Sequence, residues 1–531
     1  MPPERLGGRG AGLTGLLLSI LCADLAWAGK LLVIPADGSH WTGMKMMVEE
    51  LGKRGNEVVL VMPEVSRSIG PAEHTTTLTY PVPYTKSQLQ AIQMRNLDTL
   101  VAQDSSNLLK KIYSSYMTLQ VMRNYTIVAC ESMLFNKEVM KILREYDFDA
   151  ILTDPFEPLG VIVAEYLDLP SIYISGGLPC SVESVSSQCP YPPSYVPRRF
   201  TRFTDHMTLW QRIVNFLWTA IEPVACRWRY ASIEELASRL LQRKTSMTEM
   251  MSHASLWFMR FDFTFEFPRP LMPNTVMIGG LNCEGSKPLP LELETFVNKS
   301  GDHGFVVFTL GSMVSQIPEE KAQLFLEAFR QIPQRVLWRY TGPTPANLPQ
   351  NVKLMKWLPQ NDLLGHPKAR AFMTHGGTHG LYEGICNGVP MVMMPLFGDQ
   401  GDNVQRMVTR GVGEVLNIHY TTSEEVVWAL NKVINDTSYK EKIQKLSAIH
   451  KDRPIEPLDL AVHWTEFVMR HKGAEHLRPA AHNLNWFQYH SLDVIGLLLS
   501  VVAIVIAATV KSCTFCFRKC CRRKTQKKKK E

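Results

Sequence analysis

Ala371–Asn403 reads AFMTHGGTHGLYEGICNGVPMVMMPLFGDQGDN. Its first residues, Ala371–Thr374, are an apolar run that predicts a buried strand, and Gly380–Cys386 has the pattern of a helix that Gly388 ends. Val389–Leu396 is a second apolar run of strand length. A strand, a helix and another strand in this order predict a βαβ unit, whose two strands lie parallel in a sheet covered by helices.

The turn between the first strand and the helix is rich in glycine and in hydrogen-bond donors. The N-terminus of a helix offers unpaired backbone N–H groups and a partial positive charge, and glycines let the backbone approach a phosphate. The glycines alone would fit a tight turn without a ligand equally well. The residues expected to contact an anionic ligand here are Thr374, His375, Gly376, Gly377, Thr378, His379 and Gly380.

The polar and aromatic residues around this turn are those that a nucleotide sugar needs. Glu383 lies one turn into the helix, where it can accept hydrogen bonds from ribose hydroxyls. Asp399 and Gln400 follow the second strand and offer acceptors and donors for sugar hydroxyls. Upstream, Trp357 offers an aromatic face on which a base can stack, and Gln360 offers an amide. The whole series favours a nucleotide-sugar site over a plain turn.

Strands alternate with helices along most of the chain, on both sides of the polar segment Leu281–Gly304, which is the best linker candidate. In the N-terminal half, a strand at Lys30–Pro35, a helix at Trp41–Arg54 and a strand at Glu57–Met62 predict one βαβ unit. A strand at Asp149–Thr153, a helix at Leu159–Leu167 and a strand at Ser171–Ile174 predict a second, and Gln88–Leu143 between the two units is expected to be helical.

Two parallel sheets in series predict an α/β protein with two Rossmann-like domains, 29–285 and 286–480, facing across a cleft at the carboxyl ends of their strands. Phe200–Met251, rich in Trp, Phe and Met, is expected to be helical, and its segment 200–230 is expected to be ordinary core. A pliable acceptor pocket or a membrane-facing surface is the alternative for that segment.

The two ends of the chain predict a membrane protein that enters the secretory pathway. Residues 1–28 carry arginines, an apolar run and a small-residue cleavage pattern, as a signal peptide does. Residues 494–510 are seventeen uncharged, mostly apolar residues, enough for a spanning helix. Aromatic residues in the juxtamembrane segment 481–493 precede it, and the basic tail 511–531 follows, so a single-pass type I protein with a cytosolic tail is expected.

The charge of the chain is concentrated in that tail. The whole chain carries +7, residues 511–531 carry +9 and residues 1–28 carry zero, so the body carries −2, which does not support nucleic-acid binding. Lys528 and Lys529, fourth and third from the end, resemble the dilysine signal for the endoplasmic reticulum, although a generic basic run is the alternative. Three sequons, at Asn124, Asn298 and Asn435, are expected to face the lumen.

The six cysteines of the body are widely scattered and lack the spacing of metal ligands. Cys180 and Cys189 are one candidate disulfide pair, but the sequence leaves the pairing open. We therefore expect no metal site and no redox cofactor.

Residues 357–403, WLPQNDLLGHPKARAFMTHGGTHGLYEGICNGVPMVMMPLFGDQGDN, resemble the signature of the UDP-glycosyltransferases, and more narrowly of the vertebrate UDP-glucuronosyltransferases of family one. WRYTG at 338–342 and MRHKGAEHLRPAAH at 469–482 extend the resemblance, which covers essentially the entire chain. It implies the GT-B glycosyltransferase fold, in which the N-terminal domain holds the acceptor and the C-terminal domain holds the UDP-sugar.

The resemblance implies a role for each candidate residue of the C-terminal half. Trp357 stacks on uracil, Gln360 touches the nucleoside and Glu383 the ribose. Ser312 and the 374–380 turn hold the diphosphate, and His379 is a variable position among relatives. Asp399 and Gln400 meet the sugar.

The resemblance also implies that His40 is the general base, which takes the proton of an acceptor hydroxyl while the oxygen attacks the anomeric carbon with inversion. Asp154 would hold the other ring nitrogen, and Asp149 is its rival for that role. A glucuronate carboxylate calls for a cation, and Arg260 and Arg339 are the two candidates.

The resemblance implies transfer of glucuronic acid from UDP-glucuronate to small lipophilic acceptors, such as phenols, steroids, bilirubin-like or xenobiotic compounds, for detoxification and elimination. It also implies an endoplasmic reticulum membrane location and homo- or hetero-oligomers with family members. A UDP-glucose or UDP-galactose transferase and a catalytically silent family member are the alternatives. A nicotinamide oxidoreductase is disfavoured because the one GxGxxG, at 10–15, lies in the signal peptide, and a serine hydrolase because no GxSxG occurs.

Overall fold

The structure is a computed structural model that describes residues 28–91, 108–283 and 285–528. The chain divides into two compact units, Met1–Leu477 and Arg478–Glu531. The larger unit holds two parallel β-sheets and their helices, and the smaller unit is helical. Apart from Ala28, the expected signal segment lies outside the described residues.

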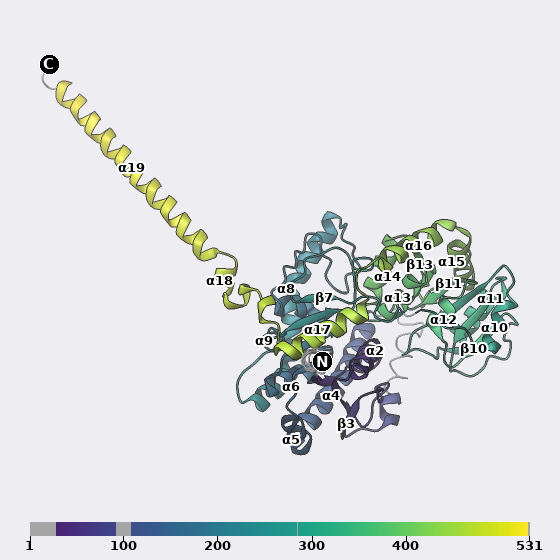
Figure 1. Cartoon of the computed structure of the whole chain (residues 1–531). Helices are drawn as coiled ribbons and strands as arrows, with labels where there is room; N and C mark the ends of the chain where they lie inside the picture. Colours follow the sequence, from purple (N-terminus) through teal and green to yellow (C-terminus); the bar gives the residue numbers. More distant parts are fainter. Residues whose placement is uncertain (1–27, 92–107, 284, 529–531) are drawn as a thin grey trace, which may run out of the picture. The chain divides into compact units, whose positions relative to one another are not determined.

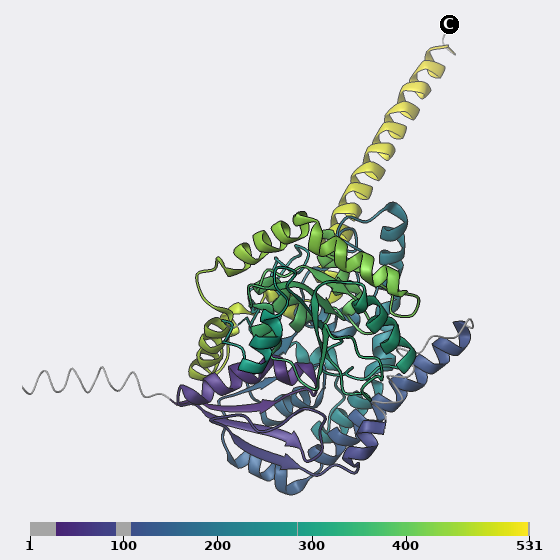
Figure 2. The ribbon, with the colours of Figure 1, turned by 90° about the vertical axis from the view of Figure 1, so that its right-hand side faces the viewer.

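Seven parallel strands form the first sheet, in the order β3-β2-β1-β4-β5-β6-β7. Figure 2 shows the strands near the N-terminus, drawn in purple, side by side. Because β1 pairs with both β2 and β4, the strand order reverses there, and open parallel sheets bind ligands at such a point. The strands are β1 (Lys30–Ile34), β2 (Glu57–Pro63), β3 (Thr76–Tyr80), β4 (Ala150–Thr153), β5 (Ser171–Ser175), β6 (Leu256–Met259) and β7 (Thr275–Met277).

The helices of this half connect these strands. The predicted βαβ units are confirmed, because α2 joins β1 to β2 and α6 joins β4 to β5. The stretch expected to be helical from 88 to 143 is helical from 88 to 91 and again in α4 and α5, and its residues 92–107 lie outside the described part of the chain. The helices are α2 (Ser39–Lys53), α4 (Leu108–Leu134), α5 (Lys137–Glu145), α6 (Leu159–Leu167), η1 (Pro179–Ser181), α7 (Val182–Ser186), α8 (Leu209–Leu241) and α9 (Met247–Met251).

Six parallel strands form the second sheet, in the order β10-β9-β8-β11-β12-β13. Its strand order reverses between β8 and β11, so the loops after these two strands meet at one edge. The strands are β8 (Phe305–Thr309), β9 (Arg335–Arg339), β10 (Val352–Met355), β11 (Ala369–Thr374), β12 (Met391–Met393) and β13 (Gly413–Val415).

The second sheet has its own set of helices, and one of them interrupts the polar segment expected to be a linker. That helix, α10, has two acidic residues in its first turn, where the helix dipole favours them. The helices are α10 (Leu291–Asn298), α11 (Glu319–Arg330), α12 (Gln360–Leu364), α13 (Thr378–Cys386), α14 (Gln400–Thr409), α15 (Ser423–Asn435), α16 (Thr437–Lys451), α17 (Pro457–His471) and η2 (Glu475–Leu477).

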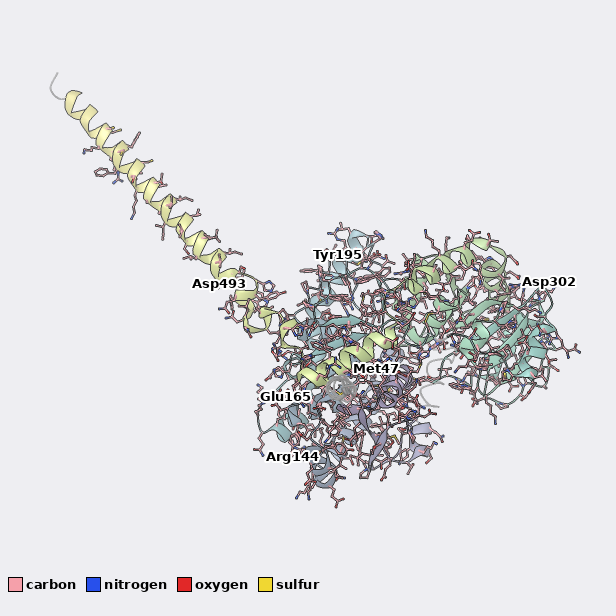
Figure 3. The ribbon with its side chains drawn as sticks, viewed as in Figure 1. Met47, Arg144, Glu165, Tyr195, Asp302 and Asp493 are labelled. Carbon is pink, nitrogen blue, oxygen red and sulfur yellow. A yellow bond between two sulfur atoms is a disulfide. The ribbon has the colours of Figure 1, made fainter. Side chains whose placement is uncertain are left out.

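Alternate residues of the strands enter different cores, so both faces of the sheets are covered. Leu31 and Val33 of β1 pack with α2 and α17, whereas Leu32 and Ile34 belong to the core on the other face. Met47 of α2, which Figure 3 labels, is fully buried in the first of these cores. Helix α17 lies beside α2 (Figure 1), so the end of this unit returns to the first sheet.

The expectation that residues 200–230 are ordinary core is wrong for the first half of α8. Apolar residues there are exposed, with Trp210 at 71%. The core contacts of the helix lie in its second half, at Tyr230, Ile233 and Leu236. Composition alone is misleading here, because the first half is apolar around most of its circumference and still packs on neither sheet. The other exposed apolar residues are Leu209, Ile213, Phe216, Leu217, Trp218, Ile221, Val224 and Trp228.

Two disulfide bonds join cysteines that the sequence could not pair. Cys180 bonds to Cys226 rather than to Cys189, and Cys283 bonds to Cys386. The first links the loop after β5 to α8, and the second links the segment before α10 to the end of α13.

The unit from Arg478 onward consists of η3 (Ala480–Asn483), α18 (Trp486–Tyr489) and α19 (Leu492–Lys528). The stretch Leu492–Cys521 of α19 is long and apolar enough to cross a membrane, with a mean hydropathy of 2.5 over its most apolar window. The candidate span therefore contains the predicted residues 494–510 and extends beyond them.

Candidate active site

His40 and Asp154 form a hydrogen-bonded pair at the carboxyl ends of β1 and β4. These strands are neighbours in register, with Ile34 beside Thr153, so the loops that follow them meet. His40 Nδ1 lies 2.7 Å from Asp154 Oδ2. The Asp154 side chain is fully buried, while that of His40 is 25% exposed. The predicted pair is therefore assembled, and the ring has access to solvent.

The bond at Nδ1 leaves the other nitrogen of His40 for a substrate. Among the described residues, no hydrogen bond involves Nε2. Burial raises the pKa of Asp154, but the charge and hydrogen bond of His40 and the charge of Arg260 outweigh it, so the net pKa lies below its ordinary value. Asp154 is thus an anion beside the ring. Asp149, the rival, lies at the start of β4, where it accepts from the N–H of Lys30 at 2.7 Å.

Arg260 and Phe156 complete the surroundings of the His40 ring. Arg260 Nη2 lies 3.2 Å from His40 Nδ1 and 3.6 Å from Asp154 Oδ2, and its Nε is buried without a hydrogen-bond partner among the described residues. Phe156 stacks on His40 with ring centroids 4.6 Å apart, and the phenyl ring is 41% exposed. An exposed aromatic ring beside an imidazole is a suitable surface for an aromatic acceptor.

The glycine-rich turn joins β11 to α13 as predicted. Gly377 precedes the helix, and no side chain caps its first N–H groups within the described structure. Such uncapped N–H groups are the feature that binds phosphate at a helix N-terminus. The His375 ring fills the space beside two glycines: a Cβ atom at Gly311 or at Gly377 would lie 2.5 Å from it. Larger residues at either position would displace the ring.

His375 acts as a neutral donor in this site. Burial lowers its pKa to about 4, so near neutral pH the ring carries one N–H and no charge. The cation nearby is Arg339, which donates to the carbonyl oxygens of Gly311 and Ser312. Its guanidinium lies 5.3 Å from the centre of the Trp357 ring. Ser312 is exposed at the same edge.

Gln360 and Glu383, two of the residues predicted to hold the nucleoside, contact each other, and Trp357 lies three residues before Gln360. Trp357 is 65% exposed, which leaves its ring open for a base to stack on. The Gln360 amide donates to Glu383 Oε2. Burial raises the pKa of Glu383 to about 7 despite that hydrogen bond.

This raised pKa predicts that UDP binding depends on pH through Glu383. Ribose hydroxyls donate more strongly to the carboxylate than to the carboxylic acid, which has fewer acceptor sites, so UDP binding favours ionisation. The UDP association constant, measured by titration calorimetry, is expected to rise as the pH goes from 6 to 8. The β-phosphate also titrates near pH 6, and Glu383→Gln provides the control because it keeps only that contribution. Identical pH profiles for the two proteins would exclude Glu383 from the ribose site.

His379 connects the donor turn to the acceptor half. Burial, with Arg260 adding to it, lowers the pKa of His379 to about 4, so the ring is neutral and is within the electrostatic reach of the cation beside His40. The ring lies 2.9 Å from the amide of Asn282, which the sequence analysis missed. His379 also lies 3.7 Å from Glu383. At this point a residue of the C-terminal half, His379, therefore contacts a residue of the N-terminal half, Asn282.

Asp399 and Gln400 differ in what they offer a sugar. Asp399 Oδ2 accepts from Thr378 Oγ1 at 3.3 Å and from Asn403 at 2.9 Å, which leaves Oδ1 for a ligand. Gln400 is buried, and its carbonyl oxygen accepts from the N–H groups of Leu396 and Phe397. Only the amide NH₂ of Gln400 is left to donate to a sugar hydroxyl.

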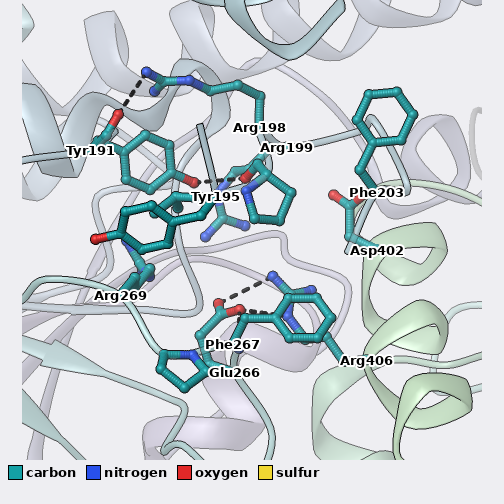
Figure 4. Close-up of a pocket in the computed structure, with 13 residues that line it drawn as sticks. Tyr191, Tyr195, Arg198, Arg199, Phe203, Glu266, Phe267, Arg269, Asp402 and Arg406 are labelled. Atoms are coloured by element: carbon teal, nitrogen blue, oxygen red, sulfur yellow. Dashed lines mark hydrogen bonds and ion pairs between the residues drawn. The ribbon is translucent and has the colours of Figure 1, made fainter. Parts of the chain in front are cut away.

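Helix α14, which begins with these residues, is attached to the acceptor half one turn later. Asp402 accepts from the N–H groups of Phe200 at 2.6 Å and Arg202 at 2.8 Å. Arg406 makes two hydrogen bonds to Glu266, at 2.6 and 3.1 Å, both drawn in Figure 4. Burial raises the pKa of Glu266, but Arg406 and other arginines lower it to about 2. The donor-side helix and the acceptor half thus share a buried ion pair.

Arg199 is a further cation between the two half-sites that sequence reasoning missed. Its guanidinium donates to the carbonyl oxygen of Gly176 at 3.1 Å, pairs with Glu183 at 3.6 Å and interacts electrostatically with Asp399. A Cβ atom at Gly177 would lie 1.2 Å from it. The adjacent glycines after β5, Gly176 and Gly177, were the one sequence feature that could have indicated a large side chain packed there.

A group of residues with metal-binding side chains lies outside this site. Cys283, Cys386 and His450 have their ligand atoms within 4.8 Å of one another, but the two cysteines are bonded to each other. His450 Nδ1 is held by Asp262 at 2.7 Å. The arrangement joins the two halves through a disulfide and a hydrogen bond.

The family model described as "UDP-glucoronosyl and UDP-glucosyl transferase" matches residues 29–529. The chain belongs to this family. It is 52% identical over 509 residues to UDP-glucuronosyltransferase 1A5 of Rattus norvegicus, covering 96% of each chain. It is 51% identical over 529 residues to UDP-glucuronosyltransferase 1A1 of Homo sapiens, covering 100% of this chain and 99% of that protein.

Solved structures agree with the family in fold. A UDP-glucosyltransferase from Polygonum tinctorium superimposes with a TM-score of 0.57 at 16% identity, covering 84% of this chain and 99% of that one. CalG4, the calicheamicin glycosyltransferase, superimposes with a TM-score of 0.54 at 16% identity, covering 84% and 99%. The predicted GT-B fold is therefore confirmed, and the chain is a glycosyltransferase of this family.

Proposed function

We propose that this protein transfers glucuronic acid from UDP-glucuronate to hydroxyl and other nucleophilic groups of small lipophilic acceptors, with inversion, to give β-D-glucuronides. The transfer itself follows from the family and from relatives about 52% identical over nearly the whole chain. The observation that supports the assignment of the reacting residues is the His40–Asp154 pair, whose atoms lie 2.7 Å apart. Burial lowers the pKa of His379 in the donor turn, and Arg260, the neighbour of this pair, lowers it further.

On the donor side, Trp357 stacks on uracil and Glu383 accepts from the ribose. The diphosphate lies at the uncapped N-terminus of α13, where the N–H groups, the His375 ring N–H and the Ser312 hydroxyl donate to its oxygens. These donors stabilise the negative charge that the leaving UDP gains. Asp399 and the Gln400 amide bind the sugar hydroxyls.

On the acceptor side, Nε2 of His40 takes the proton of the hydroxyl as the oxygen forms its bond to the anomeric carbon. The bond from that carbon to UDP breaks on the opposite face, so an α-linked donor gives a β-glucuronide. Asp154 stabilises the imidazolium through Nδ1. After the transfer, the proton on His40 is released to water.

The glucuronate carboxylate is bound by Arg260 rather than by Arg339. Arg260 lies beside His40 and has an unpartnered Nε, whereas Arg339 lies at the Gly311–Ser312 turn beside Trp357, where the nucleotide binds. A guanidinium binds a carboxylate through two parallel hydrogen bonds.

The protein is a single-pass type I protein of the endoplasmic reticulum membrane, with its body in the lumen, its basic tail in the cytosol and homo- or hetero-oligomers of family members as its assembly. The candidate span Leu492–Cys521 and the exposed sequon residues Asn124, Asn298 and Asn435 support this location.

The test is a donor comparison with the full chain in membranes. Wild type is expected to form β-glucuronides from phenols and steroids with UDP-glucuronate and to use UDP-glucose and UDP-galactose poorly. Arg260→Gln should remove about 2–5 kcal/mol of carboxylate binding, or roughly 30-fold or more in kcat/KM, with UDP-glucuronate, in addition to any loss, common to all three donors, from its contacts with His40 and Asp154. Arg339→Gln is the matched control and should weaken all three donors alike. Equal use of UDP-glucose by wild type would refute the donor assignment, and no turnover with any acceptor would indicate a silent family member.

A further inference from the structure

Glu157 is a carboxyl group beside the reacting residues that the transfer reaction does not use. It lies in the loop between β4 and α6, three residues after Asp154. The residue before it, Phe156, stacks on the His40 ring. An acceptor that places its hydroxyl at His40 and its ring against Phe156 can therefore extend toward Glu157.

This carboxyl group lacks a cation. Oε1 accepts the N–H of Asp37 at 3.3 Å, and no Lys, Arg or His of the described residues forms an ion pair with Glu157 within 4.0 Å. The neighbouring carboxylate, Asp37, has both a cation and hydrogen-bond donors: it pairs with Arg67 at 3.4 Å and accepts hydrogen bonds from Ser68. One of two adjacent carboxyl groups is thus satisfied and the other is not.

Aromatic side chains lie around the unsatisfied carboxyl group. Tyr84 is close enough that Glu157 contributes, after burial, to raising its pKa to about 12. The Tyr84 ring lies 5.1 Å from that of Tyr125, and the ring of Phe156, the residue before Glu157, is exposed. A carboxyl group with aromatic rings beside it is a suitable site for an ammonium group, which pairs with the acid and is attracted to the ring faces.

We propose that Glu157 is a specificity-determining residue, which binds a protonated amine on the acceptor while His40 receives the acceptor's hydroxyl. This inference rests on the proposed function and extends it, because it names aminoalkyl phenols as a preferred acceptor class. The ammonium group supplies the cation that the carboxyl group lacks in the described structure. A neutral phenol of the same shape cannot do so.

The pH dependence of this preference has a definite sign. Burial, with Asp37 adding to it, raises the pKa of Glu157 to about 7, against weaker opposite effects of Arg67 and His40. An ammonium group binds the ionised form, so the preference for cationic acceptors is expected to grow as the pH rises through 7. The other titratable groups facing this region are Tyr80, Tyr84 and Cys130, whose raised pKa values keep them neutral there.

The experiment compares two acceptors of nearly equal shape, tyramine and 4-propylphenol, with the full chain in membranes. In wild type, the ratio of kcat/KM for tyramine to that for 4-propylphenol should rise from pH 6 to pH 8. In Glu157→Gln the ratio should fall by about tenfold or more, as expected for losing a charged hydrogen bond, and should no longer change across pH 7. Asp168→Asn, at the exposed far end of α6, removes the same charge and should leave the ratio unchanged.

A second measurement separates this inference from the proposed function. Binding of tyramine and of 4-propylphenol is measured by titration calorimetry on the same proteins, without UDP-sugar and without turnover. A tyramine preference lost in Glu157→Gln supports the inference whether or not transfer occurs. An equal ratio in wild type and Glu157→Gln overturns it, while glucuronide formation from 4-propylphenol would still support the proposed function.

Discussion

Replacing His40 by alanine is expected to reduce turnover of phenols and alcohols by about 10²- to 10⁴-fold, the usual contribution of a general base. The acceptor proton then has no recipient, because Asp154 is buried behind the ring and its oxygen lies 2.7 Å from Nδ1, on the far side from the substrate. Affinity for UDP should be unchanged, since the contacts proposed for the nucleotide belong to the second sheet. Initial rates and UDP titration on the same preparation measure both quantities.

The choice of acceptor distinguishes loss of a base from general damage. A carboxylic acid acceptor is already ionised near neutral pH and needs no base, so His40→Ala should retain much more of its activity toward such an acceptor than toward a phenol. An equal loss for both would indicate that His40 has a structural role. Full activity of His40→Ala on hydroxyl acceptors would refute the base assignment.

Replacing Asp399 by alanine is expected to lower kcat/KM for UDP-glucuronate by roughly tenfold to a hundredfold, because a hydrogen bond to a charged group contributes about 1.5–3 kcal/mol. The loss should appear with every acceptor. UDP, which has no sugar, should inhibit the variant and wild type with similar constants. This difference between UDP-glucuronate and UDP places the effect at the sugar.

The internal contacts of Asp399 require a control. Its Oδ2 accepts from Thr378 and Asn403, so the alanine variant also loses support for the turn. Asp399→Asn keeps an oxygen for these contacts and should recover part of the activity. If Asp399→Ala weakened UDP and UDP-glucuronate equally, Asp399 would be holding the diphosphate turn and not the sugar.

The strands and helices could be predicted because their residues are apolar with the right period. KLLVI at 30–34 and the run ending at Thr374 lie in the interior of parallel sheets and are buried on both faces, so local composition is enough to identify them. The helix α6 begins and ends at the predicted residues, Leu159 and Leu167. The segment around Trp210 was predicted wrongly, because an apolar composition does not say whether a sheet lies beside it.

Apart from His40 and Asp154, which the family resemblance indicates, the candidate site was predictable where a motif carries it. His375 and Glu383 belong to one short stretch with a recognisable pattern, whereas Arg199 and Glu157 lie in loops that meet only through the strand order. Gln400 was expected to offer both a donor and an acceptor to the sugar, but its side-chain carbonyl oxygen accepts a hydrogen bond from the backbone N–H of Leu396. Cys226 joins Cys180 across 46 residues, because α8 returns to the loop after β5, and no local spacing indicates this.

The most direct test is a structure of the His40→Ala variant with UDP-glucuronate and a phenol bound. We expect uracil to stack on Trp357 and phosphate oxygens to lie within about 3 Å of the first N–H groups of α13. We also expect the anomeric carbon to face the phenol oxygen, at the place where the His40 ring lies in the wild type. UDP bound away from the N-terminus of α13, or residue 40 out of reach of the phenol oxygen, would contradict this expectation.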